Sequence, residues 1–219
     1  MLAPGVQWAG AQRDVLAGDI EGHVDLETLS LLPFLYALGP LEGLRGEVSI
    51  FDGVPSIARI ERDMVMTAAT WQARACFLVW AQVAEWSEST IDAAIVGLHG
   101  LEREAVARAG DVRLDGERPW LFRVRGTAVG ATFHVLDKRD GLRHDPERHE
   151  AAKVRMRLAR EPVDLVGFYS RRHRGIFTPG ASNVHVHLRT GDGRMSGHLE
   201  AIELAPGARL AVPAPGWRQ

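Results

Sequence analysis

The amino-acid sequence predicts an α+β fold in which strands predominate. Glycine, proline and turn dipeptides divide the 219 residues into many short segments, most of them apolar or alternating and therefore typical of strands. Only two longer stretches are compatible with helices, so the regular strand–helix alternation of a parallel α/β sheet is not predicted. We expect two mixed or antiparallel β-sheet halves with a few helices.

The expected elements follow one another without a low-complexity linker. Helices are expected at roughly 26–34 and 89–109, the second opening with a capping-like Ser/Thr run and ending at Gly110. The strand-like segments are, in order, "GEVSIFDG", "SIARIER", "MVMTAATW", "ARACFLVWAQV", "PWLFRVRGTAV", "ATFHVLD", "VDLVGFYS", "NVHVHLRT" and "MSGHLEAIEL". The charged tract "DKRDGLRHDPERHEAAKVRMRLAREP" is expected to be a solvated connection with a short helix from His149. We therefore expect one domain, 1–219, with an N-terminal half of about 1–115 and a C-terminal half of about 116–219.

Composition narrows the classes of partner. A hydrophobic content of 46% suffices for a buried core, and a net charge of -2 with both signs spread along the chain leaves no footprint for nucleic acid or anionic lipid. The single Cys76 lies in an apolar run, where a buried thiol is expected rather than a reactive one. No secretory leader pattern is visible, and no apolar run reaches the roughly 20 residues that span a bilayer. We expect a cytoplasmic protein with a small-molecule partner.

Three histidines are concentrated in "NVHVHLRTGDGRMSGHLEAIEL". His185 and His187 are two residues apart in a strand pattern, so both point to one face. The Asp-Gly pair predicts a two-residue type I′ turn centred on Asp192 and Gly193, which sets His187 directly opposite His198. Opposed residues lie about 4.5–5.5 Å apart and His185 is one diagonal step away, so all three imidazoles are expected to converge.

Three neutral histidines that leave one coordination position open are the ligand set of a catalytic zinc ion. The alternative is a polar sheet face with unrelated histidines, and two histidines alone would favour it. The third, at the cross-strand position, favours a metal, because crowded imidazoles without one make each other's protonation unfavourable. The prediction depends on the turn, since a one-residue change in its length would move His198 to the opposite face.

The sequence resembles the α-acetolactate decarboxylase family. The segment "VHVHLRTGDGRMSGHL" matches the spacing of the family's final His-x-His, turn and Gly-His signature, and "VDLVGFYS" looks like the strand before it. Upstream, "GVQWAGAQRDVLAGDIEGHVDLETL" is similar to the family's opening segment, and "YALGPLEGLRGEVSIFDG" is similar to the stretch that carries an acidic active-site residue. The resemblance covers nearly the whole chain.

The resemblance implies an acetolactate decarboxylase-like fold, a Zn²⁺ ion held by His185, His187 and His198, and a homodimer. It also implies that Glu47 is the active-site carboxylate, although a glutamate at a strand start would otherwise be a solvated charge. The implied reaction converts acetolactate to acetoin and CO2, with zinc as the Lewis acid that stabilises an enediolate.

Two departures from the family put the substrate in question. His134 stands where the family has an arginine, and a further C-terminal glutamate has no counterpart in "APGARLAVPAPGWRQ". An arginine can hold a carboxylate bidentately and a neutral histidine cannot. His134 could instead act as an acid or base near neutral pH. Glu200 could be a partner of a metal ligand or a proton donor, or a solvated strand-edge charge.

Alternatives therefore stay open. The protein could be a different zinc enzyme, such as a decarboxylase, isomerase or hydratase of a related keto or hydroxy acid, or a non-catalytic member that binds a small ligand. The arginines of "SRRHRG", Arg171, Arg172 and Arg174, either line the pocket entrance or lie in a solvated loop.

Overall fold

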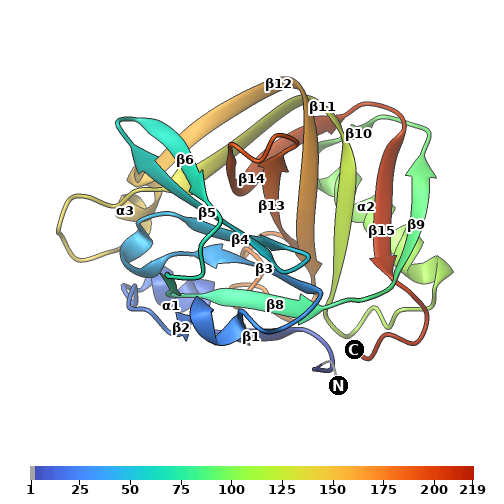
Figure 1. Cartoon of the computed structure of the whole chain (residues 1–219), viewed down its shortest axis with the longest axis horizontal. Coiled ribbons are helices and arrows are strands. Elements are labelled where there is room, and N and C mark those ends of the chain that lie inside the picture. The colour runs from blue at the N-terminus through green and yellow to red at the C-terminus, as the bar shows by residue number, and fades with distance from the viewer. Residues whose placement is uncertain (1–2) are drawn as a thin grey trace.

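The computed structural model describes residues 3–219 and contains two large antiparallel β-sheets (Figure 1). The first sheet has the strand order β1-β8-β3-β4-β5-β6. Its strands are β1 (Gln7–Ala9), β3 (Leu35–Pro40), β4 (Glu47–Phe51), β5 (Val54–Glu61), β6 (Met64–Ala68) and β8 (Leu78–Gln82). The short strands β2 (Val24–Asp25) and β7 (Arg74–Ala75) form a separate two-stranded sheet.

The second sheet has the order β10-β14-β13-β12-β11-β15-β9. Its strands are β9 (Trp86–Ile91), β10 (Ile95–Val96), β11 (Trp120–Leu136), β12 (Lys153–Tyr169), β13 (Val184–Thr190), β14 (Ser196–Leu204) and β15 (Ala208–Pro213). Strands β11 and β12 are 17 residues each and pair along their length. Because β14 pairs with both β13 and β11, the four strands β11 to β14 close on themselves. This closure brings β11 beside the histidine strands.

Residues 3–219 also form three helices: α1 (Gln12–Leu16), α2 (Gly97–Asp111) and α3 (Pro146–Ala151). Short 3₁₀ turns occur at Leu26–Leu29 and Glu42–Leu44. None of the helices in residues 3–219 is long and apolar enough to cross a bilayer. The predicted fold class, an α+β fold of mixed or antiparallel sheets with a few helices, is confirmed, and the paired strands of both large sheets are antiparallel.

The two large sheets pack against each other through a shared apolar core. Side chains of the first sheet, such as Leu38 and Val79, meet Leu121, Val166 and Phe168 of the second. Strand β4 contacts both β13 and β14. A face of β4 is therefore held against the histidine hairpin, and the burial of apolar area between the sheets maintains that position.

The helix expected at 89–109 was predicted too long. Helix α2 begins only at Gly97, because residues 89–91 belong to β9, where Ser89 pairs with Leu210 of β15. The N-cap is Val96, without a side-chain hydrogen bond, so the Ser/Thr run does not cap the helix. The helix expected at 26–34 is a single 3₁₀ turn, capped by the Asp25 carboxylate.

The charged tract is more structured than predicted. Helix α3 begins at Pro146, with the Asp145 side chain accepting from the Arg148 backbone N–H, rather than at His149. Residues 153–162 are the first half of β12, and their backbone groups pair with β11. The sequence of this segment did not predict a strand, because most of its side chains are exposed to solvent on both faces of β12.

Candidate metal centre

The hairpin β13–β14 has the register that the sequence predicts. His187 is directly opposite His198, followed by Leu188 opposite Gly197. Strand β14 can also lie close to β11 because residue 197 is a glycine. A Cβ at this position would lie 2.4 Å from the His134 carbonyl oxygen and 2.9 Å from the Phe133 ring. The glycine thus allows β14 to pair with β13 on one side and β11 on the other.

The turn itself differs from the prediction. The loop contains four residues, 191–194, between Thr190 and Met195, whose backbone groups are hydrogen-bonded. The Gly193 N–H donates to the Thr190 carbonyl, and only Gly193, not Asp192, has a positive φ, at 72°. A type I′ turn needs positive φ at both central residues, so this is not one. Because two and four are both even numbers, the register of the histidines is unchanged.

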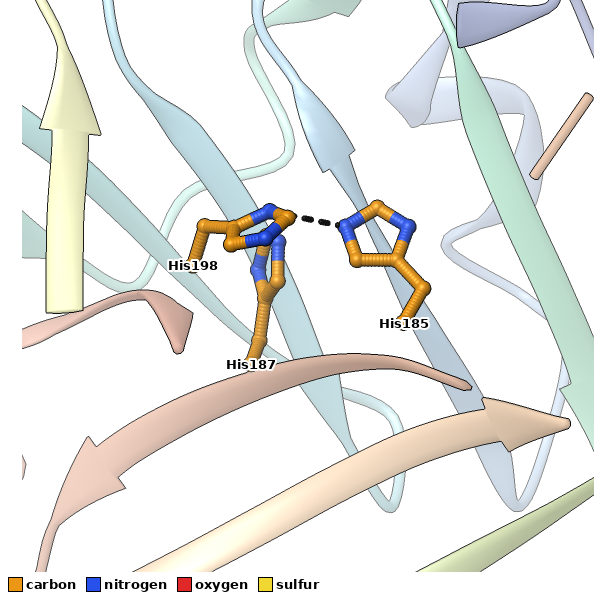
Figure 2. Close-up of side chains that lie close together, drawn as sticks. All are labelled: His185, His187 and His198. Atoms are coloured by element: carbon orange, nitrogen blue, oxygen red, sulfur yellow. Dashed lines mark hydrogen bonds between the residues drawn. The ribbon is translucent and has the colours of Figure 1, made fainter. Parts of the chain in front are cut away.

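The three imidazoles converge from β13 and β14 (Figure 2). Nε2 of His185 lies 3.0 Å from Nδ1 of His198, and one ring nitrogen from each of His185, His187 and His198 lies within 4.8 Å of the others. Zinc–nitrogen bonds of about 2.0–2.1 Å in a tetrahedron place ligand nitrogens roughly 3.3 Å apart. The cluster is therefore close to the size that a metal ion requires, and small side-chain rotations would complete it.

Two contacts orient the ligand nitrogens. The Phe177 carbonyl lies 2.9 Å from Nδ1 of His185, closer than the Gln12 side-chain amide nitrogen at 3.2 Å. Since a carbonyl only accepts, the shorter contact assigns the proton to Nδ1, and Nε2 presents its lone pair to the cluster. Ser49 Oγ lies 2.9 Å from Nδ1 of His187. Such partners of metal-bound histidines set the ring orientation and tautomer.

Burial supports a metal at this site. His185 and His187 are buried, and burial lowers the pKa of His185 to about 3 and that of His187 well below its usual value. Both rings are therefore neutral at pH 7, as metal ligands must be. Among residues 3–219, Nε2 of His187 has no hydrogen-bond partner although it is buried. A buried ring nitrogen without a partner is costly, and a cation held by the three imidazoles would satisfy it.

Glu47 is brought to the cluster from the other sheet. It begins β4, its side chain is 2% exposed, and its Oε2 lies 3.8 Å from Nε2 of His187. Burial raises the pKa of Glu47 to about 8, which the Leu136 backbone and the charge of Lys153 oppose. A carboxyl group with this pKa can both accept and donate a proton near neutral pH.

His134 and Glu200 are adjacent to the cluster and to each other. His134 pairs with His198 across β11 and β14, and their rings stack at 4.6 Å. Nδ1 of His134 lies 2.9 Å from Oε1 of Glu200, which reaches it because a β-bulge interrupts the β11–β14 ladder at this point. Burial is the largest influence on His134 and lowers its pKa, although Glu200 acts in the opposite direction.

A cleft of about 330 Å³ opens onto the cluster, and His185 and His198 form part of its wall. The other polar residues that line it come from five elements or loops: Gln12, Glu47, His134, His149, Glu150 and Lys153. The three loop arginines lie elsewhere. Arg171 and Arg172 contact Glu117, and Arg174 contacts Asn183. These contacts fit the interpretation of a solvated loop.

The residues that the sequence did not reveal are those that support the ligands. Ser49 could have been found, because it is two residues after Glu47 and therefore on the same face of β4. The Phe177 carbonyl carries no sequence signal. Cys76 is buried as predicted, with its Sγ near the carbonyls of Pro40 and Leu41, and burial raises its pKa to about 12.

Neither a protein-family model nor a curated protein sequence matches the chain. Solved structures do. α-Acetolactate decarboxylase from Bacillus subtilis strain 168 superposes with a TM-score of 0.76 at 16% identity, over 96% of this chain and 86% of that one. The enzyme from the subspecies spizizenii gives 0.78 at 15% identity, over 95% and 85%.

The chain has the acetolactate decarboxylase fold. A Staphylococcus aureus protein of unknown function, described as similar to α-acetolactate decarboxylase, shares this fold with a TM-score of 0.75 at 13% identity, over 94% of this chain and 84% of that one. At such identities the acetolactate decarboxylase fold is established, and the activity is a separate question.

Proposed function

We propose that this protein is a zinc-dependent decarboxylase of a 2-hydroxy-3-oxo acid, converting acetolactate to acetoin and CO2. The observation that carries the proposal is the cluster of His185, His187 and His198, with a buried and unpaired His187 Nε2, at the wall of a cleft. The shared fold supports it, because the same overall structure is found in acetolactate decarboxylases.

The reaction requires little beyond charge stabilisation and proton control. The bond between the carboxylate and the hydroxyl-bearing carbon breaks, CO2 leaves, and the electron pair that remains takes up one proton to give a C–H bond. A divalent metal held by the three histidines would act as a Lewis acid toward the negative charge that develops on the substrate's oxygens. The tasks left for the protein are binding, orientation and delivery of the proton.

Glu47 is the residue best placed to control the proton. Its carboxyl group is buried 3.8 Å from His187, and its pKa of about 8 permits proton exchange near pH 7. In this proposal Glu47 takes the proton of the substrate hydroxyl and returns one during product formation. His134, stacked on His198 in the wall of the cleft, is the second candidate acid or base.

A related zinc enzyme acting on a different keto or hydroxy acid is the second candidate function. The observation that favours it is His134, which burial keeps neutral and which therefore cannot replace the charge of an arginine toward a carboxylate. A non-catalytic protein that binds a small ligand in the same cleft is the remaining alternative.

Metal analysis and an acetoin assay separate these candidates. Purified protein should contain about one zinc ion per chain and release acetoin from racemic acetolactate, and His187→Ala should lose both properties. His23→Ala, at an exposed histidine outside the cleft that pairs with Asp19, is the matched control. Protein that binds no zinc when reconstituted would refute the proposal, and zinc-bound protein that releases no acetoin would favour the related enzyme.

A further inference from the structure

The cleft contains a lysine to which neither the metal site nor the proposed proton transfer assigns a role. Lys153 is the first residue of β12, directly after α3, and its side chain is 19% exposed. It is one of only two lysines in a chain rich in arginine. Lys138, the other, is buried against Asp140 and the Leu142 carbonyl. Only Lys153 of the two lines the cleft.

The ammonium group of Lys153 has donors to spare. Its Nζ donates to Glu150 Oε2 at 2.7 Å, while Glu200 Oε1 is 3.9 Å away and beyond hydrogen-bond distance. An ammonium group has three N–H donors, so two are available to another acceptor. Glu150 is 57% exposed and is also paired with Arg155, so its link to Lys153 is a weak surface ion pair that a ligand can displace.

Lys153 shares the wall of the cleft with Glu47, His134 and His198. Arg155, the neighbouring cation on β12, is not part of the wall and is bound to both Glu150 and Glu200. Among the described residues that line the cleft, Lys153 is therefore the one lysine or arginine, and its remaining N–H donors can bind a negatively charged ligand.

We propose that Lys153 binds the carboxylate of an anionic substrate in this cleft while the rest of that substrate faces the three histidines. The inference rests on the proposed function. Lys153 would supply the positive charge that the neutral His134 does not. A lysine is a point charge without the planar fork of arginine, so it tolerates the change in geometry as a carboxylate becomes CO2. Because the carboxylate loses its negative charge when it becomes CO2, Lys153 contributes mainly to substrate binding.

Binding can be measured without turnover. The zinc-reconstituted protein is titrated calorimetrically with two analogues of acetolactate. The first, 2-hydroxy-2-methylbutanoate, keeps the carboxylate, and the second, 3-hydroxy-3-methylbutan-2-one, has a methyl group in place of the carboxylate. We expect Lys153→Met to weaken binding of the acid about 10- to 100-fold, the range of a hydrogen bond to a charged group, and to leave the neutral ketone within about twofold. Lys153→Arg should restore most of the acid affinity.

Arg157→Met is the matched control. Arg157 is an exposed cation on the same strand, outside the cleft, and its removal changes the net charge by the same amount. It should leave binding of both compounds unchanged. Lys153→Gln provides a second variant if the methionine substitution prevents folding. Unchanged acid binding in the folded Lys153 variants, or an equal loss in Arg157→Met, would overturn the inference.

Kinetics distinguishes this inference from the proposed function. If wild-type protein releases acetoin, Lys153→Met should raise KM by about tenfold or more and change kcat less. An unchanged KM would remove the role of Lys153 and leave the decarboxylase standing. If wild-type protein releases no acetoin but binds the acid through Lys153, the carboxylate site stands and the proposed reaction fails.

Discussion

Ser49 and Ser56 offer a paired test of how the first sheet holds the candidate metal ligands on the second. The two serines are direct cross-strand partners on β4 and β5, and both are buried. Ser49 Oγ lies 2.9 Å from Nδ1 of His187, whereas Ser56 Oγ donates to Ser196 Oγ at the same distance. Replacing either by alanine removes one buried hydroxyl and one hydrogen bond, and only Ser49→Ala releases a ligand ring.

The two substitutions should have similar effects on stability and different effects on metal binding. Each loses a hydrogen bond worth about 0.5–1.5 kcal/mol, which corresponds to roughly 1–6 °C in Tm for a chain of this size. Ser49→Ala should in addition weaken zinc binding about 10- to 100-fold, or about 1.4–2.8 kcal/mol, because His187 is no longer held in its ligating orientation. Ser56→Ala should bind zinc as the wild type does.

Competition with a chromophoric zinc chelator measures the affinity, and thermal unfolding of the metal-free protein measures the stability. The reasoning is refuted if both variants fold and the zinc affinities of Ser49→Ala and Ser56→Ala agree within about twofold. If both affinities are reduced equally, the effect is one of general packing near the hairpin.

Three further predictions concern the same site. Glu47→Gln should keep its zinc and lower the rate of acetoin release by about 100-fold or more, measured at saturating acetolactate, and a rate near that of wild type would exclude Glu47 from the chemistry. Gly197→Ala should destabilise the protein by roughly 1–3 kcal/mol in urea denaturation, because its Cβ would lie 2.4 Å from the His134 carbonyl; Gly116→Ala, where a Cβ meets nothing within 4 Å, should have a much smaller effect. The metal-free protein should lose stability as the pH falls below about 6.5, because burial depresses the pKa of His185 to about 3 and those of His187 and His198 in the same direction, so the unfolded chain binds more protons. Each histidine contributes up to about 1.4 kcal/mol per pH unit, and Glu47, with its pKa raised to about 8, opposes one of them between about pH 4.5 and 8. Equal stability in urea at pH 7 and pH 5 would contradict the buried, neutral state of the cluster.

The sequence by itself determined the convergence of the three histidines, the candidate metal ligands, because their geometry is local. Side chains alternate along a strand, so His185 and His187 share a face, and an even number of loop residues brings His198 to that face. The turn was predicted with the wrong type and two residues too short, yet the parity of the loop preserved the result. The family resemblance then selected Glu47, which no local pattern distinguishes from a solvated charge.

Only the tertiary structure decided what surrounds those ligands. Ser49 and Glu47 reach His187 because the two sheets pack face to face, 138 residues apart in the sequence for the Ser49 contact. Glu200 meets His134 through a bulge, and Lys153 lines the cleft because a tract expected to be solvated is instead paired with β11. These contacts join residues far apart in the chain, and they depend on packing and ladder irregularities that leave no periodic signal in the sequence.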